Sequence, residues 1–206
     1  MGLSIHYRGT LTDKNQIYPL IDELEDIAKS MQWEYRLFDE DWSQRPDATL
    51  EKGEAGTLKI EGDARLKGVI LNVHEDCESL SLCFDASGAI TSLLNVALNA
   101  EEGYPSGPQW LSVKTQFAGP EVHVAVVKLL RYLKSKYLHD LEVNDESGYW
   151  ETDDYGAVVE NIDLINRGIA AITRRLEAAR PESTDDIIAQ IEKALRDMQD
   201  RENREE

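Results

Sequence analysis

Hydrophobic and polar residues alternate at the start of the chain and then change period. Leu3, Ile5 and Tyr7 alternate with polar residues, which predicts a half-buried strand over residues 3–7. Apolar residues then recur every three or four positions, which is typical of an amphipathic helix. They are Ile17, Leu20, Ile21, Leu24, Ile27, Ala28 and Met31. Strict alternation returns over residues 33–37, so the opening segment is predicted to be a β-α-β unit.

The middle of the chain carries short apolar stretches separated by turn residues. Residues 40–56 have little periodicity and are predicted to form a loop. Four strands are expected after it, near residues 58–60, 69–73, 80–84 and 89–94. Their short connections favour antiparallel pairing in a β-meander. Residues 95–110 contain two glycines and two prolines, which indicates a long connection.

The opening pattern then returns with a second strand, helix and strand. Leu111-Ser112-Val113 repeats the pattern of Leu3-Ser4-Ile5 at an offset of 108. A helix that begins near Pro120 is expected to bury Val122, Val126, Leu129, Leu130, Leu133 and Tyr137. The identities between the two segments are few, so the repeat is interpreted as architectural, with common origin left open.

The C-terminal part has a heptad pattern. Its apolar residues are spaced 4-3-4-3-4, as in the a and d positions of a coiled coil, and are Val158, Ile162, Ile165, Ile169, Ile172 and Leu176. Pro181 is expected to stop this helix, and Ser183 or Thr184 to cap another. The second helix would present Ile188, Ile191, Leu195 and Met198. An αα-hairpin is therefore predicted.

Together these patterns predict an α+β fold. We expect a mixed, largely antiparallel sheet with two β-α-β units, helices packed on one face, and a C-terminal αα-hairpin. The predicted organisation is a β-α-β unit plus meander over 1–94, a connection over 95–110, a second β-α-β unit over 111–156 that shares the first core, a helical hairpin over 157–200 and a frayed tail over 201–206.

Charge restricts the partners that can be expected. The 206 residues include 40 acidic and 22 basic ones, for a formal net charge of −18. Such a charge disfavours nucleic acid and anionic membranes as partners. No apolar run approaches the ~18 residues of a membrane span. The N-terminus lacks a signal-peptide pattern, and two cysteines are too few for a disulfide framework, so a cytoplasmic location is predicted.

Two groups of residues could bind a cation. His74, Asp76 and Cys77 crowd one predicted turn, with Cys83 nearby, and imidazole, carboxylate and thiolate groups are metal ligands. The alternative is a solvated acidic turn. The second group consists of carboxylates after the two β-α-β units, namely Asp39, Glu40, Asp41, Asp145, Glu146, Glu151, Asp153 and Asp154. They could hold Mg²⁺ or Ca²⁺ or act as an acid/base pair, or be ordinary loop residues.

A basic helix and a set of aromatics offer binding surfaces. Lys128, Arg131 and Lys134 lie off the apolar stripe of their helix and could bind an anion, or could balance the acidic residues that follow. Aromatic residues in predicted loops or strand ends suit an interface or a cap over the core. They are Trp42, Tyr104, Trp110, Tyr149, Trp150 and Tyr155.

The sequence contains no nucleophile, phosphate-loop, dinucleotide or zinc-protease motif. The leading prediction is a non-catalytic protein-interaction or homo-oligomeric module. One alternative is a divalent-metal-dependent hydrolase or transferase that uses loop carboxylates. Another is an acidic inhibitor of a basic protein. No cofactor is predicted, although a divalent cation is possible.

Overall fold

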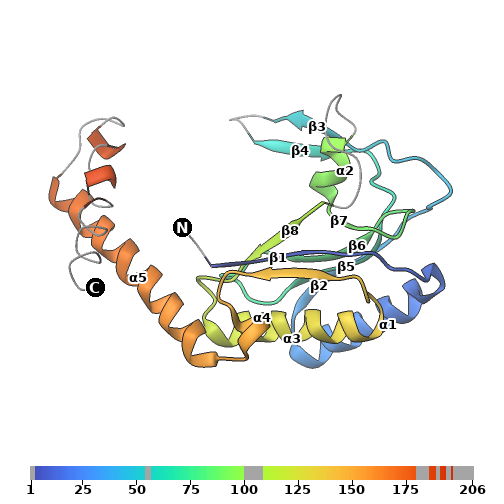
Figure 1. The fold of residues 1–206 in the computed structure, drawn as a ribbon. Helices are drawn as coiled ribbons and strands as arrows, with labels where there is room; N and C mark the ends of the chain where they lie inside the picture. Colours follow the sequence, from blue (N-terminus) through green and yellow to red (C-terminus); the bar gives the residue numbers. More distant parts are fainter. Residues whose placement is uncertain are drawn as a thin grey trace. The chain divides into compact units, whose positions relative to one another are not determined.

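The computed structural model describes residues 3–53, 57–99, 109–179, 186–188, 191–193 and 196. It confirms an α+β fold built from helices and antiparallel sheets (Figure 1). The chain divides into two compact units, residues 2–158 and residues 159–206. Helix α5 (Tyr155–Ala179) begins in the first unit and continues in the second.

The first sheet has three strands with β1 (Ser4–Arg8) in the centre. Strands β8 (Leu111–Lys114) and β9 (Glu142–Asp145) flank it, and both pair antiparallel to it. Because both oppose β1, β8 and β9 run parallel to each other. Helix α3 (Pro120–Lys136) connects them. The predicted second β-α-β unit is therefore present, with β1 inserted between its two strands.

The second sheet contains β2 (Glu34–Asp39), β5 (Lys67–Asn72), β6 (Leu80–Phe84) and β7 (Ile90–Thr91), in that order and all antiparallel. The strands of the first predicted β-α-β unit, β1 and β2, thus lie in different sheets. The two sheets are linked beyond the end of β1, where the Ile90 N–H donates to Gly9 O at 2.9 Å and the Leu11 N–H donates to Gly88 O at 2.7 Å.

Helices α1 (Ile17–Met31), α3 and α4 (Tyr149–Thr152) lie on one side of the sheets, as predicted for a one-sided helical layer (Figure 1). A 3₁₀ turn, η1 (Lys14–Gln16), precedes α1 and is capped by Asp13. The α1 stripe is buried from Ile17 to Ala28, with Ile27 half-buried, whereas Met31 is 52 % exposed. Burial of these stripes against the sheets forms the main core.

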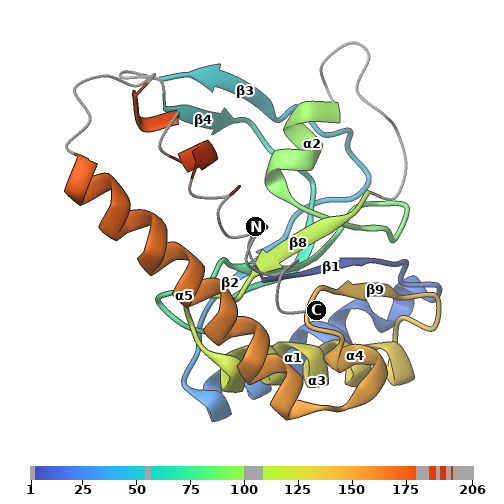
Figure 2. The same ribbon diagram turned by 60° about the vertical axis from the view of Figure 1, so that its left-hand side comes forward.

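A small hairpin and a helix correct the sequence prediction. The predicted loop over 40–56 contains β3 (Thr49–Lys52), which pairs with β4 (Leu58–Glu61). Residues 93–99, predicted as strand and connection, form helix α2 (Leu93–Asn99). Both ribbon views place α2 beside the hairpin (Figures 1 and 2). A separate core cluster joins them, made of Phe38, Ala48, Ala64, Leu66, Cys83, Val96 and Ala97.

The C-terminal prediction is only partly covered by the described residues. Helix α5 ends at Ala179, and residues 186–188, 191–193 and 196 are helical as well. Pro181, Ser183, Thr184, Leu195, Met198 and the tail over 201–206 lie outside the described residues. None of the described helices is long and apolar enough to cross a membrane.

Candidate functional site

The apolar heptad stripe of α5, here called the α5 seam, lies on one helix as predicted. Its first two residues, Val158 and Ile162, are buried. Ile165 and Ile172 are half-buried, and Ile169 is 41 % exposed. The side chain of Leu176 lies outside the described part of the chain. The seam is therefore closed at its start and open to solvent further along α5.

Polar contacts fix the start of α5. The Ala157 N–H donates to Asp154 Oδ1 at 3.2 Å, so Asp154 acts as a helix N-cap. The Tyr155 hydroxyl donates to Glu121 Oε1 at 2.7 Å, which ties α5 to the first turn of α3. This hydrogen bond lowers the pKa of Glu121. Asp154, a predicted cation ligand, is thus used to begin the helix.

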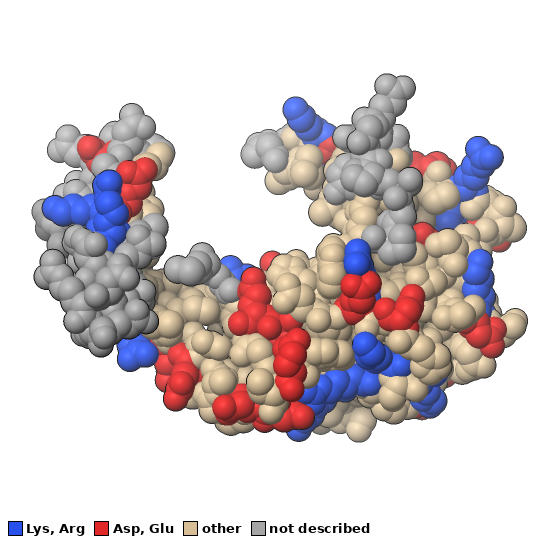
Figure 3. Space-filling view, in the orientation of Figure 1, with Lys and Arg blue, Asp and Glu red and all other residues tan. Residues whose placement is uncertain are grey.

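The basic face of α3 is largely engaged by the protein itself. Arg131 donates to Tyr149 O at 2.9 Å and to Trp150 O at 2.6 Å, and it forms an ion pair with Asp153. Lys134 donates to Leu141 O at 2.7 Å. Lys128 is exposed. Arg131 and Lys134, two of the three cations predicted for an anion site, therefore already contact acceptors of the protein. Figure 3 shows that acidic and basic side chains are interspersed on one face of the molecule.

Four of the predicted interface aromatics each lie against a cation, and they are Trp42, Trp110, Tyr149 and Trp150. Arg8 Cζ lies 4.6 Å from the ring centroid of Trp110, and Lys67 Nζ lies 5.8 Å from that of Trp42. Arg131 Cζ lies 5.6 Å from the Trp150 ring. Tyr149, the first residue of α4, is buried, and Arg131 Cζ lies 5.4 Å from its ring centroid. Tyr104 lies outside the described residues. Trp110 is the most open of the three tryptophans, at 43 % exposed.

The predicted turn ligands are engaged locally. His74 Nδ1 accepts the backbone N–H of Asp76 at 3.1 Å, and the Cys77 N–H donates to His74 O at 3.1 Å. Burial raises the pKa of the Cys77 thiol to about 11, with the charge of Glu78 adding to the effect. The thiol is therefore protonated at neutral pH. In the described part of the chain, no three His, Cys, Asp or Glu side chains are grouped to hold a metal ion.

The carboxylates after β2 have structural partners. Asp39 forms an ion pair with Lys67, and Glu40 Oε2 accepts the Leu66 N–H at 2.8 Å. Asp41 Oδ1 accepts the Ser43 N–H at 2.9 Å. Asp145, by contrast, is buried at the end of β9 in the other sheet. The two predicted carboxylate groups thus belong to different sheets and do not form one arrangement.

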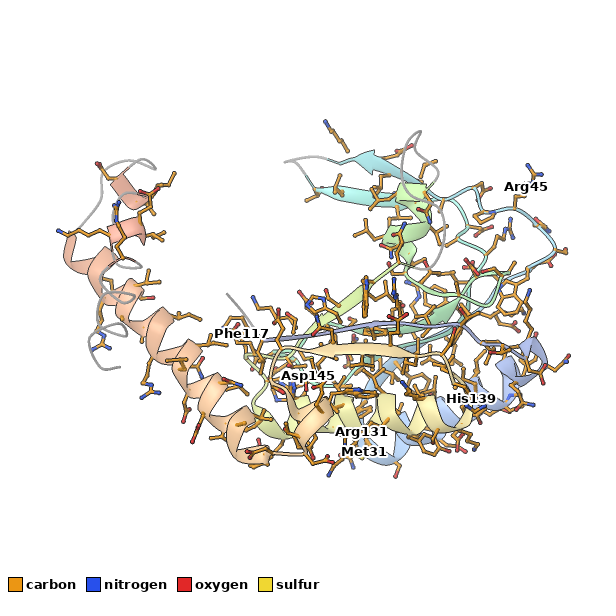
Figure 4. All side chains as sticks on the ribbon, viewed as in Figure 1. Met31, Arg45, Phe117, Arg131, His139 and Asp145 are labelled. Carbon is orange, nitrogen blue, oxygen red and sulfur yellow. The ribbon has the colours of Figure 1, made fainter. Side chains whose placement is uncertain are left out.

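A buried histidine network was not predicted from the sequence. His123 Nε2 lies 2.9 Å from Asp145 Oδ1 and 2.8 Å from Ser147 Oγ, while Nδ1 lies 2.7 Å from Thr115 Oγ1. Figure 4 shows Asp145 between the sheet and the helices. Burial opposes ionisation of Asp145, but hydrogen bonds from His123 and Ser147 outweigh it and lower the pKa of this carboxyl. A polar residue on the buried face of a helix was the available signal.

This network contains the residue types of a hydrolase triad in a different arrangement. In a catalytic triad the two ring nitrogens contact serine and aspartate separately. Here Ser147 and Asp145 share Nε2, and the side chains of His123 and Asp145 are both 0 % exposed. The Asp145 carboxylate also accepts the N–H groups of Ser147 at 2.8 Å and Trp150 at 2.9 Å. The network therefore holds the α4 turn against α3.

Comparison of the chain with protein-family models, with curated proteins and with solved structures gave no match.

Proposed function

We propose that the protein is a non-catalytic interaction module that assembles with further copies of itself through the α5 seam. The observation that carries this proposal is the exposure of Ile169, 41 %, in the middle of a heptad stripe of β-branched residues. An isolated helix is only marginally stable in water, and most helices gain stability by burying an apolar face. A partner helix on the seam would bury Ile165, Ile169 and Ile172.

The charge of α5 supports a second copy as the partner. The chain carries a formal charge of −18, but α5 contains three acidic and three basic residues and is neutral. The positions that flank the seam carry mostly uncharged side chains, among them Asn161, Asn166, Gly168 and Thr173. Like charges at such flanking positions would oppose pairing. Charge repulsion between two copies is therefore weak along this helix.

The seam residues also favour a particular number of copies. The 4-3-4 spacing puts Ile162 and Ile169 at a positions, and Val158, Ile165 and Ile172 at d positions. Isoleucine at both a and d favours three or four strands over two in parallel coiled coils. We therefore propose a trimer or tetramer. A stripe of fewer than three heptads makes this a modest interface, so assembly should depend on protein concentration.

The chemistry of the described residues favours binding over catalysis. The His123 and Asp145 side chains have no exposed surface. The pKa of Cys83 is raised to about 12 by burial, and that of Cys77 to about 11, which leaves both as unreactive thiols. A general acid or base needs a perturbed pKa together with access to substrate. His123, Asp145 and Cys83 lack access to substrate, and the half-buried Cys77 is protonated at neutral pH and therefore a poor nucleophile.

Two aspartate substitutions on α5 test the proposal. Ile169→Asp places a charge on the seam, whereas Leu164→Asp places the same charge at a c position that is 51 % exposed. Light scattering after gel filtration should show the oligomer for the unmodified chain and for Leu164→Asp, and a monomer for Ile169→Asp. Circular dichroism checks that both variants are folded. Equal masses for Ile169→Asp and the unmodified chain, or a monomeric unmodified chain, would refute the proposal.

A further inference from the structure

A small pocket lies between the two sheets, in the unit of residues 2–158. Its volume is about 230 Å³. The segment that leads into β6 approaches β8 at one end, where the Glu78 N–H donates to Lys114 O at 3.1 Å. Beyond that point the pocket is bounded by residues of β6 and β8 and by α2. The polar side chains that line the pocket are four serine hydroxyls, one carboxamide and one indole. They belong to Ser79, Ser81, Ser92, Ser112, Asn95 and Trp110.

The indole of Trp110 is held in a defined orientation. One side of its ring carries the guanidinium of Arg8, whose Cζ lies 4.6 Å from the centroid. Arg8 is held in turn by Glu142, to which its Nε and Nη2 atoms donate at 3.1 Å and 2.8 Å. Trp110 nevertheless remains 43 % exposed. An oriented, partly exposed indole at a pocket is suited to packing against the C–H face of a ligand ring.

Two polar groups that line the pocket can form further hydrogen bonds. Asn95 Nδ2 is buried without a hydrogen-bond partner. A buried donor without an acceptor is costly and uncommon, so rotation of the Asn95 carboxamide towards a ligand oxygen in the pocket would relieve it. The Ser92 hydroxyl accepts the Asn95 N–H at 3.1 Å through its oxygen and keeps its proton for a further acceptor. Asn95 belongs to α2, the helix that the sequence did not predict, and Ser92 directly precedes that helix.

From this geometry we infer that the pocket binds a neutral, polyhydroxylated small molecule of monosaccharide size. Hydroxyl groups on a ligand both donate and accept, which matches serine hydroxyls and a carboxamide. The described residues that line the pocket include no charged side chain, so a charged ligand would lose its hydration without gaining a counter-ion. Ser79 and Ser81 already donate to Asn72 Oδ1 and Thr91 O, but a purely apolar ligand would offer no acceptor to Ser92 or Asn95. The volume lies below the ~300 Å³ of typical drug-sized sites, which limits the ligand to one sugar ring.

This inference is independent of assembly through α5, because none of the described lining residues belongs to that helix. The two proposals can therefore fail separately.

Saturation-transfer NMR and calorimetry with D-glucose, D-galactose, D-mannose and D-xylose test the pocket. At least one sugar should bind with a Kd on the order of millimolar, as expected for a ligand of this size. Sodium gluconate and cyclohexanol, the charged and apolar comparators, should bind at least about tenfold more weakly. No sugar binding to the unmodified chain, or equal binding of either comparator, would overturn the inference.

Three variants show whether any binding uses this pocket. Trp110→Ala removes the indole, and Asn95→Leu removes the unpartnered donor; each should weaken binding at least about tenfold. Because Asn95→Leu removes a buried unpaired group, it should keep or raise the unfolding temperature, so loss of binding cannot be ascribed to loss of folding. Trp33→Ala changes a tryptophan that lines a different pocket and should leave binding unchanged. Unaltered binding in both pocket variants would place the sugar elsewhere and overturn the inference.

Discussion

His123 Nε2 and Asp145 Oδ1 lie 2.9 Å apart, and both side chains are fully buried. The contact joins α3 to the end of β9, across 22 residues of sequence. The same carboxylate holds the backbone of α4 through the Ser147 and Trp150 N–H groups. Since α4 directly precedes α5, this buried contact helps to fix the point from which the exposed seam starts.

Replacing His123 by leucine should lower the free energy of unfolding by about 3 kcal/mol, because the substitution leaves the Asp145 carboxylate buried without its strongest partner. Urea denaturation followed by circular dichroism measures the change. The exposed His139 provides the control, since His139→Leu should change stability by less than about 0.5 kcal/mol. Equal effects of the two variants would contradict a structural role for the network.

Glu23 should make stability sensitive to acid. Burial raises its pKa, but hydrogen bonds from Lys136, Tyr132 and Tyr137 outweigh this and lower the pKa to about 2. A depressed folded-state pKa stabilises the fold above the unfolded-state value of 4.5, and this contribution is lost as the pH falls towards 2. Because the site is partly open to water, we expect a contribution of about 1 kcal/mol.

Thermal unfolding from pH 7 to pH 2.5 checks the Glu23 prediction. The Glu23→Gln variant should be less stable than the unmodified chain at pH 7, and the difference should shrink as the pH falls. A difference that stays constant with pH would rule out the proposed titration.

Gly68 allows a close approach of β5 to β6. Its φ angle is +141°, and an added Cβ would lie 2.2 Å from Leu82 O and 2.7 Å from Cys83 Cα. Gly68→Ala should therefore cost at least about 3 kcal/mol of stability. Gly148 also has a positive φ, +75°, but has open space around it, so Gly148→Ala should cost only about 1 kcal/mol. Urea denaturation of both variants measures the difference, and similar losses would contradict the steric explanation.

Both cysteines should be alkylated more slowly than a free thiol. With its pKa at about 11, Cys77 should react with iodoacetamide about 100-fold more slowly than a thiol of pKa 9 at pH 8. Cys83 has 0 % exposure and should react only after unfolding. Mass spectrometry of timed samples, with and without urea, follows both sites. Rapid modification of Cys77 in the folded protein would show an accessible thiolate and reopen its assignment as a metal ligand.

Local patterns in the sequence predict much of the fold. The apolar stripe from Ile17 identified α1, and the alternation around Ile5 identified β1, because both elements bury one face against a common core. Helix α2 was missed because the segment from Ala89 to Leu94, with four apolar residues and a threonine, is compatible with a strand. Ser92, whose side chain accepts the Asn95 N–H at 3.1 Å, was the local signal for a helix start.

The candidate sites were less accessible to sequence reasoning because they depend on tertiary contacts. His123 and Asp145 come into contact only when α3 packs against the sheet. Their spacing in the sequence does not predict this contact. The pocket beside Trp110 likewise requires β6, β8 and α2 to come together. The sequence left open whether Arg131 binds an anion or balances the acidic residues that follow, and the fold brings Asp153 and two carbonyl groups to it. The spacing along α5, by contrast, was sufficient to predict that helix and its apolar stripe, because a heptad is a local pattern.

Sedimentation equilibrium of the unmodified chain tests the central claim, self-assembly through the α5 seam, most directly. Because each copy carries a formal charge of −18, screening of repulsion should strengthen assembly between 50 mM and 500 mM NaCl. We predict a mass of three or four times 23.3 kDa at high protein concentration, with a dissociation constant that falls as salt rises. A mass of 23.3 kDa at every protein and salt concentration would contradict the account.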